Sequence, residues 1–155
     1  MSKAIFLDVD GVLNNSESIS LLHDILGRQQ YLLLLNGLGE TPFDDRRCGG
    51  IRTLIEKTGA EVILSSTWRR SKKGIELVEK YAGIKVKDIT PYLGTSRGYE
   101  IQSYLDKHKE ITNYVIIDDD SDMLDSQRDN FVKVNSRFGF CYEDYVKAAK
   151  VLSKE

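Results

Sequence analysis

Apolar positions along this chain form short, near-continuous runs that are separated by stretches with helical periodicity. Short runs of this kind are typical of buried strands in a parallel sheet that is covered on both faces. Four such strands are predicted, at Ala4–Val9, Glu61–Ser65, Tyr114–Asp118 and Phe131–Val134. A fifth and weaker strand is predicted near Ile84–Val86.

Between the strands, apolar residues recur at the i, i+3, i+4 and i+7 spacing of amphipathic helices. These helices are predicted around Ile51–Thr58, Ile75–Ala82, Ile101–His108 and Tyr142–Ala149. Gly59 and Gly83 follow the first two helices and are expected to end them. Strands that alternate with helices predict an α/β fold, here a three-layer, Rossmann-like, doubly wound parallel sheet. Ligands of such sheets bind at the carboxyl ends of the strands.

One segment, at about 14–47, interrupts this alternation because it separates the first strand from its expected helix. It contains apolar stretches at Ile19–Leu26 and Tyr31–Leu35, and the turn-like sequence Asn36–Gly39. A connection of this length is usually functional and often covers a site. We therefore expect a single domain over 1–155 with a small helical insert that acts as a lid. The alternative is that the insert only packs against the domain and has no role at the site.

Length, charge and cysteine content narrow the class of protein. The 155 residues suit one domain with a substantial core. The formal net charge of −2 leaves no basic footprint for non-specific nucleic-acid binding, although a local cluster such as Arg46–Arg47 could meet a phosphate. Cys48 and Cys141 lack disulfide-framework or metal-site spacing, which favours reduced thiols in a cytoplasmic protein. No signal peptide is recognisable and no apolar stretch is long enough to span a bilayer, so no membrane partner is expected.

The first predicted strand ends abruptly in two carboxylates, Asp8 and Asp10, which Gly11 follows. Asp is depleted in strands, and two neighbouring carboxylates repel each other unless a cation or a proton lies between them. Residues i and i+2 of an extended chain point to the same side, so both carboxylates can converge on one metal or one substrate. Gly11 allows the backbone to turn sharply after them.

Other predicted strands also end in polar residues. The second is followed by Ser65-Ser66-Thr67-Trp68-Arg69, and the strand at Tyr114–Asp118 runs into the acidic segment Asp118–Asp122. Ser96-Arg97-Gly98 precedes the helix between these two strands. Because the carboxyl ends of parallel strands share one edge of the sheet, we expect carboxylates, hydroxyls and a cation to meet there. Charge at the end of a buried strand needs a partner, which argues against a merely solvated acidic loop.

This combination of side chains suits phosphoryl transfer. A carboxylate can attack phosphorus and form an aspartyl-phosphate. Mg²⁺ held by carboxylates and waters offsets the charge between that nucleophile and the phosphate. Hydroxyl and cationic side chains bind phosphate oxygens, and a second carboxylate with a raised pKa can protonate the leaving oxygen.

The sequence resembles the haloacid dehalogenase (HAD) superfamily of aspartate-nucleophile phosphatases, whose four motifs match in order between Ile5 and Asp122. The segment Asp8-Val9-Asp10-Gly11 is similar to the first motif. The resemblance implies that Asp8 is the nucleophile and a metal ligand. It implies that Asp10 is the general acid/base and binds metal through its backbone carbonyl. Ser65 matches the hydroxyl residue of the second motif, with Ser66 as the register alternative.

Arg97 falls where the third motif has a cation, usually Lys. Arginine keeps the charge of lysine but presents a planar fork in place of a compact point charge. Arg97 is expected to stabilise the phosphate and the charge of the nucleophile. If Arg97 cannot reach Asp8, then Lys72 or Lys73 would serve instead, or activity would be low.

The fourth motif supplies metal ligands, and the resemblance implies Mg²⁺ as the cofactor. Asp118 matches the ligand of this motif, and Asp122 lies at the usual four-residue offset. Asp119 could take the role of Asp118.

Finer features resemble the small HAD phosphatase domains of nucleic-acid repair proteins. In that resemblance Trp68 and Arg69 lie near the substrate, where an aromatic ring beside an arginine suits a base or sugar next to a phosphate. The alternative has Trp68 in the core and Arg69 on the surface. Ser66 and Gly11 complete the predicted substrate-binding residues.

The predicted function is Mg²⁺-dependent hydrolysis of a phosphomonoester through an aspartyl-phosphate on Asp8. The phosphorylated substrate could be a small molecule, a nucleotide or a nucleic-acid end. An open site suits large substrates such as nucleic-acid ends or phosphoproteins, and a nucleotide or a polynucleotide end is the preferred prediction. A receiver-like signalling module is an alternative, although receivers have a contiguous acidic pair and phosphorylate an Asp after a later strand. A non-catalytic module that only binds phosphate or metal is a further alternative. The oligomeric state is left open.

Overall fold

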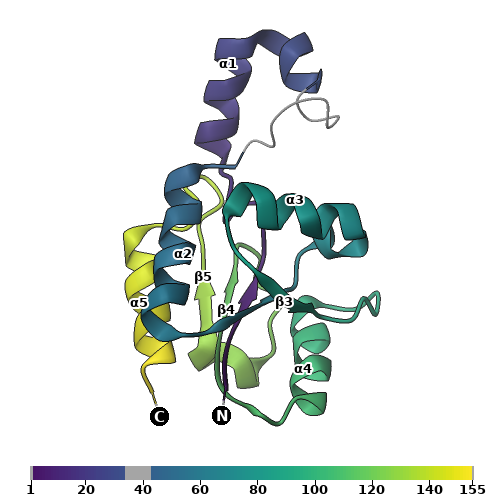
Figure 1. The fold of residues 1–155 in the computed structure, drawn as a ribbon, viewed down its shortest axis with the longest axis vertical. Coiled ribbons are helices and arrows are strands. Elements are labelled where there is room, and N and C mark those ends of the chain that lie inside the picture. Colours follow the sequence, from purple (N-terminus) through teal and green to yellow (C-terminus); the bar gives the residue numbers. More distant parts are fainter. Residues whose placement is uncertain (1, 34–42, 155) are drawn as a thin grey trace.

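The computed structural model describes residues 2–33 and 43–154 (Figure 1). In this part of the chain, five parallel strands form a sheet in the order β3-β2-β1-β4-β5. Their bounds are β1 Ser2–Leu7, β2 Glu61–Leu64, β3 Val86–Ile89, β4 Ile111–Asp118 and β5 Phe131–Lys133. With helices on both of its faces, the sheet confirms the predicted α/β, doubly wound parallel fold.

Strand bounds differ from the predicted ones by a few residues. The first strand ends at Leu7, so Asp8 already belongs to the loop that follows it. The weak strand is Val86–Ile89 rather than Ile84–Val86, because Ile84 packs into the core as a buried side chain before the ladder begins. Apolar content alone does not distinguish a strand residue from a buried loop residue.

The helices in the described residues are α1 Ser16–Leu33, α2 Asp45–Thr58, α3 Lys72–Ala82, α4 Arg97–Lys107 and α5 Tyr142–Leu152, with 3₁₀ helices η2 Thr67–Arg70 and η3 Asp125–Asn130. Helices α2 to α5 are the four that the periodicity predicts. Gly59 and Gly83 end α2 and α3 in the left-handed conformation, at φ of 70° and 66°. None of these helices combines the length and the apolar composition that crossing a bilayer requires.

β1 lies at the centre of the sheet, and its side chains alternate between two hydrophobic cores. Ile5 and Leu7 pack in the core that includes residues of α2, α3 and α5. Phe6 packs on the opposite face, with Ile101 and Tyr104 of α4. All three β1 side chains are fully buried. The strand can therefore present polar groups only at its ends, which directs attention to the loops beyond Leu7.

α1 occupies the first part of the predicted insert and rises from the carboxyl end of the sheet (Figure 1). The helix is interrupted at Gly27, where φ is 76° and ψ is 163°. The helix lies within the predicted insert, whereas Asn36–Gly39 lies outside the described residues. That the insert acts as a lid stays a prediction.

Candidate active site

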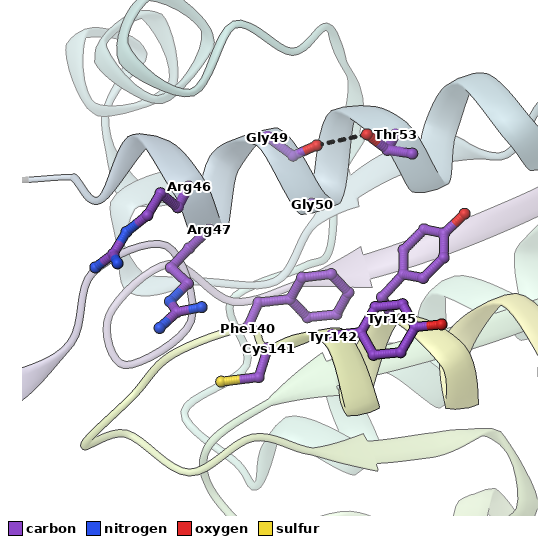
Figure 2. Close-up of a pocket in the computed structure, with 9 residues that line it drawn as sticks. All are labelled: Arg46, Arg47, Gly49, Gly50, Thr53, Phe140, Cys141, Tyr142 and Tyr145. Atoms are coloured by element: carbon purple, nitrogen blue, oxygen red, sulfur yellow. Dashed lines mark hydrogen bonds between the residues drawn. The ribbon is translucent and has the colours of Figure 1, made fainter.

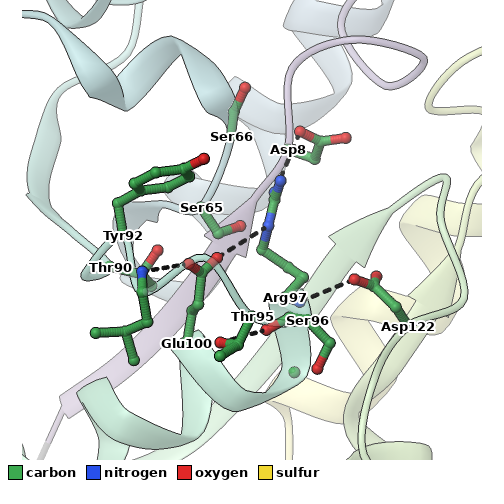
Figure 3. A network of polar contacts seen from close by, with 12 residues as sticks. Asp8, Ser65, Ser66, Thr90, Tyr92, Thr95, Ser96, Arg97, Glu100 and Asp122 are labelled. Carbon is green, nitrogen blue, oxygen red and sulfur yellow. Dashed lines mark hydrogen bonds and ion pairs between the residues drawn. The ribbon is translucent and has the colours of Figure 1, made fainter.

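The loops at the carboxyl ends of β1, β2 and β4 form the candidate active site (Figure 3). Because β1 lies between β2 and β4, Asp8 stands between Ser65 and Asp118. Backbone hydrogen bonds extend the ladder past the strand ends. The amide of Asp8 donates to the carbonyl of Ile117 at 3.0 Å, and the amide of Ser65 donates to that of Leu7 at 3.0 Å. Segments far apart in the sequence thereby present their polar side chains at one edge of the sheet.

Asp8, Asp118 and Asp119 form a carboxylate cluster in which one oxygen from each lies within 4.8 Å of the others. Gly11 makes room for it. At φ of 82°, a Cβ on residue 11 would lie 2.3 Å from Oδ2 of Asp119. The turn and the close approach of Asp119 therefore both require glycine here. Contact between Gly11 and a substrate stays a prediction.

Burial raises the pKa of Asp8 to about 8; the negative charge of Asp118 adds to this effect, and Arg97 opposes it. Burial also raises the pKa of Asp118 to about 6, although the backbone amide of Asp120 and the charge of Arg97 favour its ionised form. Adjacent carboxyl groups with raised pKa values indicate a site that can take up further positive charge.

Arg97, the first residue of α4, reaches this cluster (Figure 3). Its Nη1 lies 3.5 Å from a carboxylate oxygen of Asp8 and 3.5 Å from one of Asp118. Its Nε lies 3.8 Å from the carboxylate of Glu100, one turn further along the helix. Arg97 thus supplies the positive charge beside Asp8, and Lys72 or Lys73 is not required for it.

The ion-pair network around Arg97 carries more negative than positive groups. Its carboxylates are Asp8, Asp118, Asp119 and Glu100, and its guanidinium groups are Arg69 and Arg97. Mg²⁺ prefers hard oxygen ligands such as carboxylates. The cluster of three carboxylates, with Asp119 seated against Gly11, fits a Mg²⁺ site.

Mg²⁺ is expected to raise the thermal stability of the protein more at pH 8 than at pH 5.5. The metal needs ionised carboxylates and competes with the protons that Asp8 and Asp118 retain through their raised pKa values. Without metal, Asp8 and Asp118 bind more protons in the folded state than in the unfolded chain between about pH 4 and pH 8, so their contribution to stability falls as the pH rises through this range.

Melting curves with MgCl₂ or with chelator at the two pH values measure this effect. Asp125→Asn changes an exposed carboxylate on η3 and should keep the Mg²⁺-induced shift. A shift that is the same at both pH values would contradict the assignment of Asp8 and Asp118 as ligands.

Asp10 is not one of the three clustered carboxylates, and two donors hold its side chain. The indole Nε1 of Trp68 donates to its Oδ2 at 3.1 Å, and the side-chain amide of Asn14 donates to its Oδ1 at 3.0 Å. Asn14 in turn accepts the backbone amide of Gly11 at 2.8 Å, which ties it to the turn. Asp10 is exposed, whereas Asp8 is 9% exposed. Two carboxylates that are two residues apart thus have different surroundings, one buried and one exposed.

Trp68→Phe is expected to lower kcat/KM about tenfold for an alkyl phosphate, and much less for an aryl phosphate with a good leaving group. Phenylalanine retains the packing of Trp68 on Phe43, where the ring centroids lie 5.4 Å apart, but it cannot donate to Asp10. Protonation of the leaving oxygen matters most when the leaving group is poor. Steady-state kinetics with the two phosphates measure this difference, and equal losses on both would contradict an orienting role.

Ser65 and Ser66 are both fully buried beneath the loop after β2. The hydroxyl of Ser65 has no hydrogen-bond partner in the described part of the chain, and such an orphaned group is costly unless a ligand completes it. Ser66 Oγ accepts the amide of Trp68 at 3.2 Å and caps η2, which leaves its proton free to donate. The unpartnered hydroxyl favours Ser65 over Ser66 as the phosphate-binding residue, and both roles stay predictions.

Arg69 lies in surroundings that differ from those predicted. It is 4% exposed, and all its donor nitrogens point into the protein. Its carbonyl acceptors are those of Ser65, Ser66, Thr90 and Pro91, and it pairs with Glu100 at 2.9 Å. Arg69 therefore joins the loops after β2 and β3 to α4. Trp68 is likewise turned toward Asp10 and Phe43. The inward-facing donors of Arg69 disfavour its predicted contact with substrate, whereas contact between substrate and Trp68 stays a prediction.

Asp122 has a backbone partner that the sequence did not predict, and its role as a metal ligand stays a prediction. Its carboxylate accepts the amide of Arg97, the first residue of α4, at 2.8 Å. Among the described residues, the carboxylates close enough to share a metal ion are those of Asp8, Asp118 and Asp119. An anion at a helix N-terminus is favourable, so Asp122 is explained as the residue that holds the start of α4 in place. The geometry favours Asp119 as the partner ligand of Asp118.

Glu100 and Asn14 are site residues that the sequence pattern did not reveal. Glu100 is 3% exposed and accepts the amide of Leu93 at 2.7 Å in addition to its two arginine partners. It lies next to Ile101 in the buried stripe of α4, so a charged residue on an apolar helix face was the available signal. Asn14 offered no comparable signal, because its contacts depend on the turn at Gly11.

A cavity of about 370 Å³ lies between α2 and the start of α5, lined among others by Arg47, Phe140 and Tyr142 (Figure 2). None of the three clustered carboxylates lines it. Arg46, which also lines this cavity, pairs with Asp44 at 3.2 Å. The cavity is therefore separate from the candidate active site.

Comparison with known protein families gives one match. The model of the HAD domain in Swiss Army Knife RNA repair proteins matches residues 4–145. The matched range contains every element from β2 to η3 and all the residues of the carboxylate cluster. No curated protein and no solved structure matches the chain significantly.

Proposed function

The chain belongs to the family of HAD domains in Swiss Army Knife RNA repair proteins, and on this basis we propose that it hydrolyses phosphomonoesters through an aspartyl-phosphate on Asp8. A HAD-type, phosphatase-like role follows from the family. The proposal adds Mg²⁺ dependence and the terminal phosphate of a polynucleotide, RNA in particular, as the substrate.

The observation that carries the proposal is the difference between the surroundings of Asp8 and those of Asp10. Asp8 is buried in the carboxylate cluster, and its carboxylate lies 3.5 Å from Nη1 of Arg97. Asp10 is exposed and accepts a hydrogen bond from the indole of Trp68. A nucleophile needs a neighbouring cation to approach a phosphate dianion, and a general acid needs access to the leaving oxygen. These two environments lie two residues apart on one turn.

The proposed reaction has two steps, and Asp10 acts as the general acid in the first and as the general base in the second. Asp8 attacks phosphorus, the bond from phosphorus to the leaving oxygen breaks, and Asp10 gives its proton to that oxygen. Asp10 then takes a proton from water as the water oxygen attacks phosphorus, which releases phosphate and restores Asp8. Arg97 and the hydroxyl of Ser65 bind phosphate oxygens throughout. Mg²⁺, held by Asp8, Asp118 and Asp119, would neutralise charge between carboxylate and phosphate.

Phosphate release tests the proposal, with an aryl phosphate and with 3′- and 5′-phosphorylated oligoribonucleotides as substrates, each with Mg²⁺ or with chelator. We expect release that requires Mg²⁺ and a higher kcat/KM for one of the oligonucleotides than for the aryl phosphate. Release that persists in chelator would contradict the metal assignment. A folded protein whose melting temperature rises with Mg²⁺ but which releases phosphate from none of these compounds would support the non-catalytic alternative.

A further inference from the structure

Tyr92 presents an exposed aromatic ring at the edge of the candidate active site. It follows β3 in the chain, is 59% exposed, and lies on the same side of the site as Ser65 and Ser66 (Figure 3). Arg69 connects these positions, because its guanidinium lies 5.6 Å from the centroid of the Tyr92 ring and donates to the carbonyls of both serines.

Arg70 packs over one face of this ring. Its guanidinium carbon lies 4.1 Å from the centroid of the Tyr92 ring, and its Nη2 donates to the Tyr92 hydroxyl. Arg70 itself is exposed and has no carboxylate partner in the described residues. The ring is therefore ordered before any ligand arrives, and a cation stands beside it. Stacking on an ordered ring costs less conformational entropy than stacking on a free one.

Tyr92 and Arg70 both remain exposed despite their contact with each other. A single exposed tyrosine is ordinary on a protein surface. Here, however, the exposed ring and the exposed cation lie beside the loop after β2, because Arg69 contacts the ring and donates to the carbonyls of Ser65 and Ser66. An aromatic face next to a cation is the combination that single-stranded nucleic acids require, since every base has a face to stack and every linkage carries a negative charge.

We infer that Tyr92 and Arg70 form the surface that holds the nucleotide bearing the terminal phosphate. Its base stacks on the ring of Tyr92, and Arg70 meets the adjoining phosphodiester. This inference rests on the proposed function, which it deepens by naming how a polynucleotide end is recognised. It also transfers to this pair the aromatic-and-arginine role that the sequence pattern suggested for Trp68 and Arg69.

The preference for a base-bearing substrate tests the inference. We compare kcat/KM on a phosphorylated oligoribonucleotide with kcat/KM on the same oligonucleotide with an abasic phosphorylated end. Tyr92→Ala is expected to lower this ratio about 10- to 100-fold, the usual effect of losing one stacked base, and Tyr92→Phe should restore most of it. Arg70→Ala should lower kcat/KM on both oligonucleotides and reduce its dependence on salt.

Tyr142→Ala is the matched control, because Tyr142 is 78% exposed on α5 and lines the separate cavity of Figure 2. It should keep the wild-type ratio. A merely structural Tyr92 would lower both values of kcat/KM in parallel and leave the ratio unchanged, which would overturn the inference.

Binding to the Asp8→Asn variant separates this inference from the proposed activity. Fluorescence anisotropy measures the affinity of that variant for a labelled phosphorylated oligoribonucleotide, with Tyr92 intact or replaced by alanine. Weaker binding without Tyr92, in a protein whose wild type hydrolyses nothing, would uphold the surface and reject the activity. If the wild type hydrolyses the oligonucleotide but replacing Tyr92 does not change the affinity of the Asp8→Asn variant, the inference about Tyr92 is rejected and the proposed activity is not.

Discussion

Asp8→Asn is expected to lower turnover at least about a thousandfold and to leave the fold intact, since an amide cannot attack phosphorus and a lost nucleophile has effects of this order or larger. Asparagine nearly matches the shape of aspartate, so the contacts of Asp8 with Arg97 and the backbone of Ile117 can persist. The variant also removes a buried carboxyl whose pKa is raised to about 8. In chelator at pH 8, its melting temperature should therefore equal or exceed that of the wild type.

Phosphate release and melting curves, recorded on the same preparation, measure both parts of this prediction. Asp125→Asn is the matched control, because its exposed carboxylate lies on η3 outside the cluster. The control should keep wild-type turnover. Normal turnover by Asp8→Asn would reject the nucleophile assignment, whereas a collapse of its melting temperature would show that Asp8 is needed for the fold.

Arg69→Ala is expected to lower the free energy of unfolding by about 3–5 kcal/mol, the usual cost of breaking a buried ion pair from one side. The change leaves Glu100 buried without its 2.9 Å partner and frees the backbone carbonyls that Arg69 holds in the loops after β2 and β3. Because those loops carry Ser65 and Tyr92, activity should fall together with stability.

Urea unfolding of Arg69→Ala, with Arg128→Ala as the control, measures this effect. Arg128 forms an exposed ion pair with Asp125 at 3.7 Å, so its loss should leave the urea midpoint nearly unchanged. A raised KM with an unchanged urea midpoint in Arg69→Ala would instead favour the substrate contact that the sequence predicts for this residue.

Local patterns account for what the sequence determines by itself. The helices α2 and α3 follow from apolar spacing and end at Gly59 and Gly83, because periodicity and left-handed glycines act over a few residues. The sequence also predicts that polar side chains gather at one edge of the sheet. Asp8 and Asp118 come at the ends of apolar runs, and the carboxyl ends of parallel strands lie at the same edge. The order of motifs is enough to identify the HAD superfamily.

Only the tertiary structure decides where the side chains at that edge point. Trp68 turns to Asp10, which is 58 residues away in the sequence, and Arg69 turns to Glu100, which is 31 residues away. Asp122 caps a helix 25 residues before it, and the exposed ring and cation come from Tyr92 and Arg70. Spacing along the chain specifies which residues reach the edge of the sheet. Burial and long-range hydrogen bonds, which form only when distant loops meet, then decide which of them face the ligand and which hold the loops together.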